Sequence, residues 1–308
     1  HTMQTILGAG GSIGVALAKT LPAFTDNIRL VSRSPQKINI GDELFAADIT
    51  DAAAVDKVIS GSEVVYLTVG FPYRLKIWEQ RWPTTMRNVI DACKKYNARL
   101  VFFDNVYMYD RNYLHHMTEE TPVRPTSKKG AIRQQIADML MNEVKQGKLT
   151  ALIARAADFT NGKSSVLHQM VTDNLLKGKR ANWLIDADKI HNFTFVADAA
   201  QGTAILGNTP DAFNQVWHLP TDNTKLTGRQ WIEIFAKALN TKPRYSTLSA
   251  TMLGLLGIFM PVLKEIKEMS YQYDRDYFFD SSKFNQRFLY TPVTPEEAVK
   301  QILQQQQR

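Results

Sequence analysis

The sequence predicts an α/β protein built on a doubly wound parallel sheet. Over roughly the first 160 residues, short apolar segments alternate with longer amphipathic segments, which is the spacing of strand–helix–strand units. A glycine-rich turn follows the first apolar segment. Because such units form right-handed crossovers, all strands end at one edge of the sheet, and we expect the ligand cleft there.

The composition indicates an ordinary globular chain with a modest positive charge. Its 308 residues are 44% hydrophobic and 22% charged, with a formal net charge of +7. This charge suits an anionic cofactor or small-molecule substrate, and its spread along the chain gives little reason to expect nucleic acid as a partner. The single cysteine, Cys93, excludes an internal disulfide and fits a reducing cytoplasm.

No apolar run reaches the roughly 20 residues that a membrane span requires, so we expect no membrane partner. The longest run, Met252 to Leu263, contains two glycines and a proline. It belongs to a hydrophobic helix or helix pair over Met252 to Tyr273, which we expect to be core, with a cover over the substrate cleft as the alternative.

The glycine-rich turn is the strongest sign of a ligand. Its glycines stand three residues apart, between the strand Thr5–Leu7 and a helix that includes Val15 to Leu21. Glycine permits a sharp turn and close backbone approach, and the helix N-terminus favours a diphosphate. We therefore expect dinucleotide binding through Gly8, Gly11, Ser12, Ile13 and Gly14.

The second strand, Asn27–Ser32, indicates which dinucleotide is bound. An acidic residue at its end would bind the ribose 2′-hydroxyl of NAD, but no Asp or Glu lies between Asp26 and Asp42. Arg33 and Ser34 stand there instead, and both can hold the 2′-phosphate of NADP. The prediction is NADP, with NAD possible and a solvated Arg33 as the alternative.

The following elements complete the predicted order. Asp51 is expected to cap the helix that follows the third strand. The expected strands and helices are Leu44–Asp51, Ala52–Ile59, Glu63–Gly70, Leu75–Tyr96, Arg99–Phe103 and Thr126–Gln146.

Taken together, these motifs resemble the extended short-chain dehydrogenase/reductase family of NAD(P)-dependent epimerases and dehydratases. Gly8–Gly14 resembles its GxxGxxG turn, and Asp48-Ile49 its adenine-contacting pair. The end of the fourth strand, at Thr68, Val69 and Gly70, resembles the segment beside the ribose. Three further segments are similar to later family motifs: Arg87–Cys93, Phe193–Ala200 and Asn214–Leu219.

The resemblance implies a Rossmann domain over residues 3–160, with returning segments near 190–220. It implies a smaller α+β domain over 161–308 that mainly binds substrate, possible homodimerisation through the helices Leu75–Tyr96 and Thr126–Gln146, and a small or nucleotide-linked substrate. The apolar stripes of these two helices would equally suit packing on the sheet.

The family's catalytic positions are altered. Redox members pair a Tyr with a Lys four residues later and place a Ser nearby. Aligning Lys129 with that lysine puts Pro125 at the tyrosine position, aligning Lys128 puts Arg124 there, and the Ser position falls on Asn105. The chain is therefore interpreted as an atypical member that lacks the YxxxK tyrosine.

Other groups near the fifth strand are candidates for the missing proton donor. We select Asn105, Tyr107, Tyr109 and Lys129 as catalytic candidates, and Lys129 is also expected to hold the cofactor ribose. His115 and His116 follow in the next loop. The alternatives are strand-end packing for the two tyrosines, a strand cap for Asn105 and solvent exposure for Lys129 and the histidines.

The sequence is compatible with three functions. The first is an NAD(P)-dependent oxidoreductase or epimerase that acts on a carbonyl or hydroxyl with a non-standard proton donor. The second is a non-catalytic NAD(P)-binding redox sensor, as in NmrA-like regulators, and the third an atypical member recruited to RNA.

The C-terminal part departs from strict alternation, and no metal cluster is expected in it. We expect a helix over Ser164–Leu176, a helix from Leu226 to Leu239 opened by Thr224 or Thr227, and a frayed tail over Gln304–Gln307. The expected short strands are Trp183–Ile185 and Phe193–Phe195. His1-Thr2, ahead of Met3, are expected to be a remnant of expression.

Overall fold

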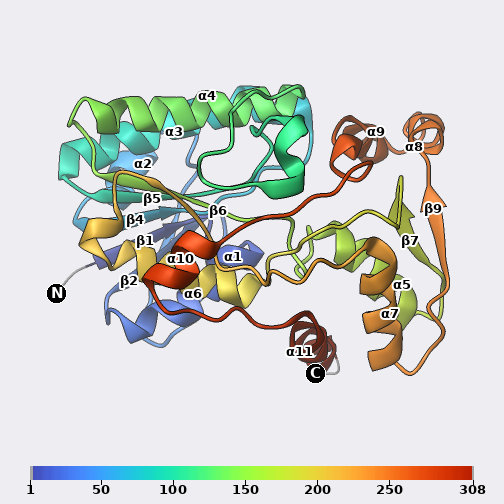
Figure 1. Ribbon diagram of the computed structural model, residues 1–308. Helices are drawn as coiled ribbons and strands as arrows, with labels where there is room; N and C mark the ends of the chain where they lie inside the picture. The colour runs from blue at the N-terminus through green and yellow to red at the C-terminus, as the bar shows by residue number, and fades with distance from the viewer. Residues whose placement is uncertain (1–2, 307–308) are drawn as a thin grey trace. The chain divides into compact units, whose positions relative to one another are not determined.

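The computed structural model describes residues 3–306, so His1-Thr2 and the last two residues lie outside it. It contains two compact units, each traced in Figure 1. The first comprises the chain up to Met108, Lys128–Arg155 and Ala199–Leu219, and the second comprises Tyr109–Ser127, Ala156–Asp198 and the chain from Pro220 onward.

The first unit is organised around a seven-stranded sheet in the order β3-β2-β1-β4-β5-β6-β8. Every neighbouring pair is parallel. Strand order reverses between β1 and β4, which is the switch point where such sheets bind ligands. The predicted doubly wound fold is confirmed. The strands are β1 (Met3–Leu7), β2 (Ile28–Ser32), β3 (Glu43–Ala46), β4 (Ser62–Leu67), β5 (Arg99–Asp104), β6 (Ala151–Arg155) and β8 (Val216–His218).

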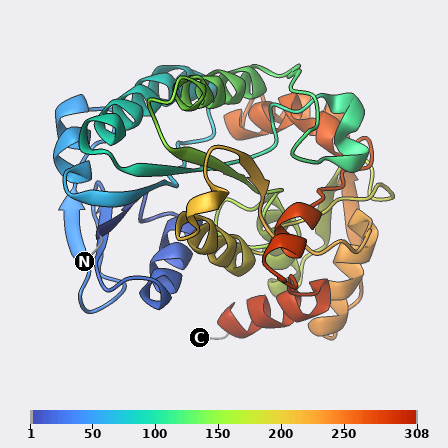
Figure 2. The same ribbon diagram turned by 60° about the vertical axis from the view of Figure 1, so that its left-hand side comes forward.

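Helices cover both faces of this sheet (Figures 1 and 2). One face carries α2 (Ala52–Ile59), α3 (Leu75–Tyr96) and α4 (Lys128–Lys145), and the other carries α1 (Ser12–Thr20) and α6 (Val196–Gly207). Asp51 caps α2 as predicted, because its side chain accepts a hydrogen bond from the Ala53 N–H at 3.1 Å.

The apolar stripes of α3 and α4 lie in the core beneath these helices. Met86 and Val89 of α3 are fully buried, as are Ile136 and Leu140 of α4. The stripes therefore pack within the single chain, and the homodimer stays a prediction.

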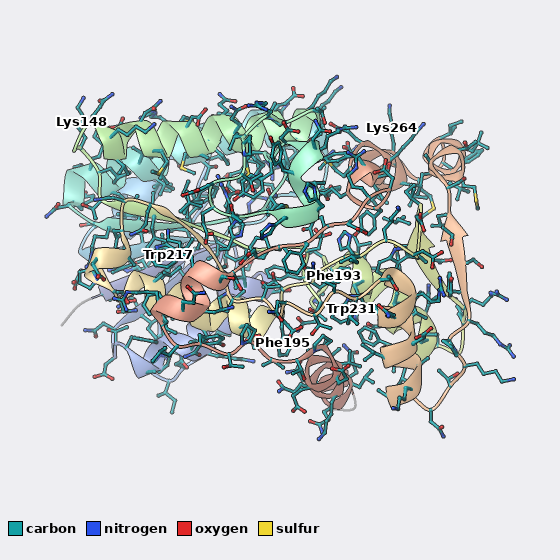
Figure 3. All side chains as sticks on the ribbon, viewed as in Figure 1. Lys148, Phe193, Phe195, Trp217, Trp231 and Lys264 are labelled. Carbon is teal, nitrogen blue, oxygen red and sulfur yellow. The ribbon has the colours of Figure 1, made fainter. Side chains whose placement is uncertain are left out.

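The second unit holds a two-stranded parallel sheet, β7 (Ala181–Leu184) with β9 (Tyr245–Leu248). Its aromatic core includes Phe193 and Trp231, whose rings meet edge to face at 5.3 Å (Figure 3). Thr227 caps α7 through a reciprocal pair of hydrogen bonds with Gln230, which confirms one of the two expected helix starts. The helices are α5 (Asp173–Leu176), α7 (Gly228–Ala238), α8 (Ala250–Leu256), α9 (Pro261–Glu268), α10 (Ser282–Arg287) and α11 (Pro295–Gln306).

Several expected elements are different in the structure. The third strand ends at Ala46, which leaves Asp48 in the following turn. Phe193–Phe195 forms only a bridge, Thr194 to Phe159, because Thr194 alone bonds the neighbouring segment. Part of the expected helix Ser164–Leu176 has π geometry, over His168–Thr172, before α5. The tail is helical to Gln306, since α11 continues through it, and Gln307 is not described.

The expectation that Met252 to Tyr273 is core is wrong as far as Glu268, because only Leu253 and Gly257 are buried in that stretch. The segment forms α8 and α9, and α9 contains no buried residue. Hydrophobic content alone does not reveal whether a neighbouring element covers a helix. None of the helices in residues 3–306 is long and apolar enough to cross a bilayer.

Candidate cofactor site and active site

The turn after β1 is held by close contact between main chains. Gly8 has φ +92°, and a Cβ on it would lie 2.5 Å from the backbone N and Cα of Val69 at the end of β4. A Cβ on Gly14 would lie 2.3 Å from the carbonyl oxygen of Gly8. Only glycine fits both positions, so the turn lies directly against the end of β4 at the switch point of the sheet.

The N-terminus of α1 presents an anion site at this turn. Its N-cap is Gly11, without a side-chain hydrogen bond, and its first turn has no acidic residue. The first N–H groups of a helix have no intrahelical acceptor, so those of Ser12, Ile13 and Gly14 can bind phosphate oxygens. The residues present thus fit a dinucleotide diphosphate.

Arg33, after β2, and Asp48, after β3, are both expected to contact the adenosine, and they lie close together. The Arg33 guanidinium lies 3.9 Å from Asp48 Oδ2, and the Arg33 side chain is 66% exposed. Hydrogen bonds from the Thr50 hydroxyl and N–H hold the pKa of Asp48 below its ordinary value, with a smaller contribution from the Arg33 charge. Ser34 is exposed beside Arg33. An exposed cation therefore follows the end of β2, the position that the sequence predicts for a 2′-phosphate contact.

Further segments that resemble family motifs are held by hydrogen bonds near the ends of β3 and β4. The Asn88 amide of α3 donates to the Ile49 carbonyl at 3.2 Å. At the end of β4, the Thr68 hydroxyl donates to the Leu7 carbonyl at 3.0 Å, and Gly70 is exposed. These bonds fix the segments expected to line the adenine and the ribose.

A buried ion-pair cluster lies at the carboxyl ends of β5 and β6. Asp104 is 1% exposed, and its two oxygens accept from Arg133 of α4 at 2.7 Å and from Arg155 at 3.1 Å. The Arg133 guanidinium also lies 4.5 Å from the centre of the Trp82 ring. Sequence reasoning missed Asp104 and Arg133. The available signals were the position of Asp104 directly before Asn105 and the four-residue spacing from Lys129 to Arg133.

Lys129 is fully buried in the first turn of α4, so the solvent-exposed alternative is wrong. Its ammonium lies 4.9 Å from the centre of the Tyr73 ring. The Tyr73 hydroxyl is 3.2 Å from that of Tyr107, whose ring stacks on Trp78 with 6.1 Å between centres. Two phenols and one ammonium thus share an aromatic environment within the first unit.

Asn105 has a local structural role. Its side-chain oxygen accepts from the Tyr107 N–H at 3.0 Å, and its own N–H donates to Asp104 Oδ1 at 2.8 Å. These bonds connect the ion-pair cluster to the turn that carries Tyr107. The partly exposed Tyr107 phenol is the accessible member of the two tyrosine candidates.

The remaining donor candidates lie in the second unit. Tyr109 is 1% exposed, which fits the expected strand-end packing of one ring. His116 Nε2 lies 2.8 Å from Asp280 Oδ2, and His115 is exposed.

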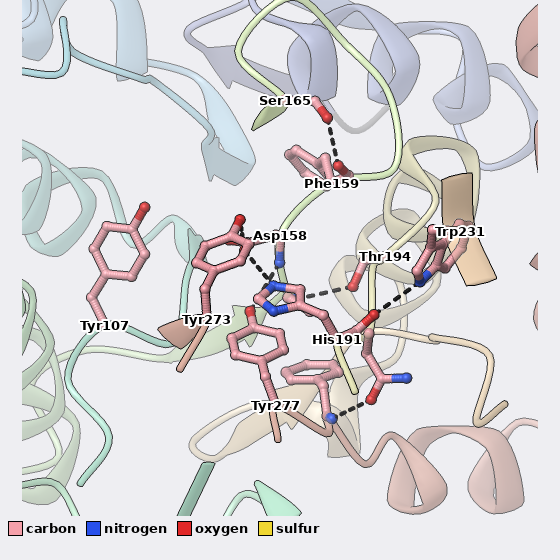
Figure 4. Close-up of polar contacts among 12 residues, drawn as sticks. Tyr107, Asp158, Phe159, Ser165, His191, Thr194, Trp231, Tyr273 and Tyr277 are labelled. Carbon is pink, nitrogen blue, oxygen red and sulfur yellow. Dashed lines mark hydrogen bonds and ion pairs between the residues drawn. The ribbon is translucent and has the colours of Figure 1, made fainter. Parts of the chain in front are cut away.

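A polar pair that the sequence did not indicate lies within the second unit (Figure 4). His191 is 2% exposed, and its Nε2 lies 2.8 Å from Asp158 Oδ2. Its ring is stacked between Tyr273 and Tyr277, at 4.4 Å and 3.9 Å between centres. The Tyr273 hydroxyl donates to the same Asp158 oxygen at 3.3 Å, so the carboxylate is held by two donors.

Comparison with known proteins identifies the family. The model of a family described as NAD(P)H-binding matches residues 8–182, more than half of the chain. The chain belongs to the NAD(P)H-binding family. Among curated proteins, no sequence matches it.

Solved structures are similar to this NAD(P)H-binding protein over nearly the whole chain. A dTDP-glucose 4,6-dehydratase from Streptomyces venezuelae with NAD bound has a TM-score of 0.80 and 14% identity, covering 100% of this chain and 98% of that one. A UDP-glucuronic acid 4-epimerase from Bacillus cereus in complex with NAD has a TM-score of 0.78 and 14% identity, covering 99% and 100%. The UDP-glucose 4-epimerase of Thermus thermophilus with NAD has a TM-score of 0.76 and 15% identity, covering 98% of each chain. The predicted resemblance to the epimerase and dehydratase fold is confirmed.

Gly14→Ala should disturb the turn, because the new methyl group would overlap the Gly8 carbonyl. We expect a loss of about 1–3 kcal/mol in stability or a comparable loss in dinucleotide binding. Thermal unfolding and calorimetric titration with NAD and NADP measure both. Gly10→Ala is the matched control, since a Cβ there meets no atom within 4 Å. Equal behaviour of the two variants would contradict the packing argument.

Asp104→Asn should destabilise the first unit, because it leaves two buried guanidinium groups without their carboxylate. Removing one partner of a buried ion pair costs about 3–5 kcal/mol. Denaturant unfolding measures this cost. Asp91→Asn is the control, since it breaks an exposed pair with Arg87 and should change stability by less than about 1 kcal/mol. A similar small change for Asp104→Asn would show that the cluster is dispensable.

Proposed function

We propose that this protein is an NAD(P)-dependent enzyme that oxidises or reduces a carbonyl or hydroxyl group of a nucleotide-linked sugar, with Tyr107 as its proton donor. The observation that carries the proposal is the Tyr107–Tyr73–Lys129 group, which lies in the same unit as the glycine turn. It offers a phenol, a second hydroxyl in contact with it and a buried cation nearby.

The substrate class is supported by the structural neighbours. The three described above are named for dTDP-glucose, UDP-glucuronic acid and UDP-glucose, and each covers nearly the whole of this chain. Their identities of 14–15% support a shared fold and leave the sugar and the nucleotide open. A net charge of +7 favours an anionic diphosphate substrate.

The cofactor would lie on the N–H groups at the start of α1, with its adenosine between Arg33 and Ile49 and its ribose near Thr68 to Gly70. When bound, NAD(P) supplies hydride transfer. The residues of the chain handle the proton. As a substrate hydroxyl is oxidised, the Tyr107 oxygen accepts its proton, and in the reverse direction the Tyr107 hydroxyl donates it.

Neighbouring groups support this role of Tyr107. The Tyr73 hydroxyl can exchange a hydrogen bond with the Tyr107 phenol at each stage, and the Lys129 ammonium lies against the Tyr73 ring. Asn105 positions Tyr107 through its backbone bond, so it is a positioning residue in this proposal. Lys129 takes the part of the family lysine, with Tyr73 and Tyr107 in place of the absent tyrosine.

Turnover with a panel of UDP- and dTDP-linked sugars tests the function directly. We expect a change in nicotinamide absorbance or an epimerised or dehydrated product with at least one sugar. Tyr107→Phe should lower kcat by about 100-fold or more, the usual contribution of a general acid or base. Tyr113→Phe, on an exposed side chain, is the control. Dinucleotide binding without turnover of any sugar or simple carbonyl would favour the redox-sensor alternative.

Arg33→Asp tests the preference for NADP, which the Arg33 position favours over NAD. Reversing the charge should weaken NADP binding by about 10-fold or more, because the guanidinium would lose its pairing with the 2′-phosphate. NAD binding should change much less. Titration calorimetry with both dinucleotides measures the ratio, and equal affinities before and after the change would remove the 2′-phosphate argument.

A further inference from the structure

The two carboxylate oxygens of Asp48, in the loop after β3, have different partners. Oδ1 accepts hydrogen bonds from the Thr50 N–H at 3.0 Å and from the Thr50 hydroxyl at 2.7 Å. Oδ2 lies 3.9 Å from the Arg33 guanidinium, which is too far for a hydrogen bond, and the Asp48 side chain is 49% exposed. Exposed ion pairs of this kind are weak, so another anion can compete with Asp48 for Arg33.

A second guanidinium, that of Arg81, lies on the side of α3 that faces this loop. Asn88 is seven residues after Arg81 and therefore on the same face of the helix. The Asn88 amide donates to the carbonyl oxygen of Ile49, the residue after Asp48, at 3.2 Å. Arg81 is about 10 Å closer to the N-terminus of α3, on the side of the carboxyl ends of the strands.

The Arg81 side chain is held at this position by aromatic residues. Its guanidinium lies 5.7 Å from the centre of the Phe71 ring, which follows the end of β4. The Phe71 ring in turn packs edge to face on Trp82, with 4.8 Å between centres. Among residues 3–306, Arg81 forms no ion pair. Its charge is therefore available to a ligand.

The charges that act on Asp48 are positive. The hydrogen bonds from its neighbouring residue lower the pKa of Asp48 most, and the charges of Arg33 and Arg81 lower it further. Two other carboxylates are close in the sequence. Asp51 caps α2, and Glu79 is two residues from Arg81, which places it on another side of α3. Two guanidinium groups therefore act on one carboxylate, which leaves positive charge in excess here.

We propose that Arg33 and Arg81 together recognise the 2′-phosphate of NADP, and that Asp48 is the internal anion with which this phosphate competes. The inference rests on the proposed function, whose cofactor site it extends by a cation from α3. A phosphate monoester carries nearly two negative charges and forms charge-assisted hydrogen bonds, which the 3.9 Å pair lacks. NAD has a hydroxyl in place of this phosphate and gains little from the excess charge.

This role of Asp48 differs from the adenine contact that the family resemblance implies. A carboxylate that binds the adenine amino group would contribute equally to NAD and NADP, because both contain adenine. A carboxylate that competes with the 2′-phosphate would act against NADP alone. The two roles therefore predict opposite effects of removing its charge.

Calorimetric titration of the full-length protein with NADP and NAD tests the role of Arg81. Arg81→Gln should weaken NADP binding by about 10-fold and NAD binding by less than about 2-fold, because only NADP carries the 2′-phosphate. Arg81→Lys, which keeps the charge, should retain part of the preference. Arg87→Gln is the matched control, since Arg87 is on the same helix and pairs with Asp91 and Glu143. Thermal unfolding checks that each variant is folded. NADP affinity that Arg81→Gln leaves unchanged would refute the two-cation site.

Asp48→Asn tests the competition. Removing the carboxylate charge should strengthen NADP binding by about 3-fold or more and leave NAD binding nearly unchanged. Adenosine 2′,5′-bisphosphate and 5′-AMP, which lack the nicotinamide half, should show the same contrast. Equal weakening of NADP and NAD by Asp48→Asn would instead assign Asp48 to the adenine and overturn the competition.

The wild-type titrations separate this inference from the proposed function. We expect tighter binding of NADP than of NAD, with a preference that decreases as salt is added, because the groups involved are exposed. Equal affinities for the two dinucleotides at low salt would overturn the inference and leave an NAD(P)-dependent function intact. Absence of binding of either dinucleotide would overturn both.

Discussion

The close approach of one main-chain segment to another at the switch point is the constraint on which the candidate cofactor site depends. Gly8 lies against the backbone of Val69, and Gly14 against the carbonyl of Gly8, with no room for a Cβ at either residue. This packing brings the end of β1, the end of β4 and the start of α1 together. The first N–H groups of the helix then point to the place where the strand order reverses, an arrangement that suits a diphosphate.

A second constraint is electrostatic. The Asp104 carboxylate pairs with two buried guanidinium groups, and these pairs connect the carboxyl ends of β5 and β6 to the N-terminal part of α4. A buried charge without a partner would be costly, which makes the positions of these three groups interdependent. Through Asn105, the same cluster orients the turn that carries Tyr107. The cluster therefore helps to position the proposed proton donor.

The second unit has closely packed aromatic residues in its core and exposed apolar residues on α8 and in the turn after it. The imidazole of His191 lies between two tyrosine rings and against Asp158, a fully packed arrangement. By contrast, α8 and the turn that follows it expose apolar side chains, among them Leu255, Ile258 and Phe259.

The sequence by itself determined the strand–helix alternation, the glycine turn and the cap at Asp51, because these depend on neighbouring residues and backbone preferences. It also indicated Arg33 and Asp48, which follow adjacent strands. Only the tertiary structure decided the partners of Arg133, which is 29 residues from Asp104, and the burial of Lys129. It also decided that Ile258 and Phe259 are exposed. Long-range pairing and the covering of an apolar helix depend on which elements meet, and local sequence does not encode that choice.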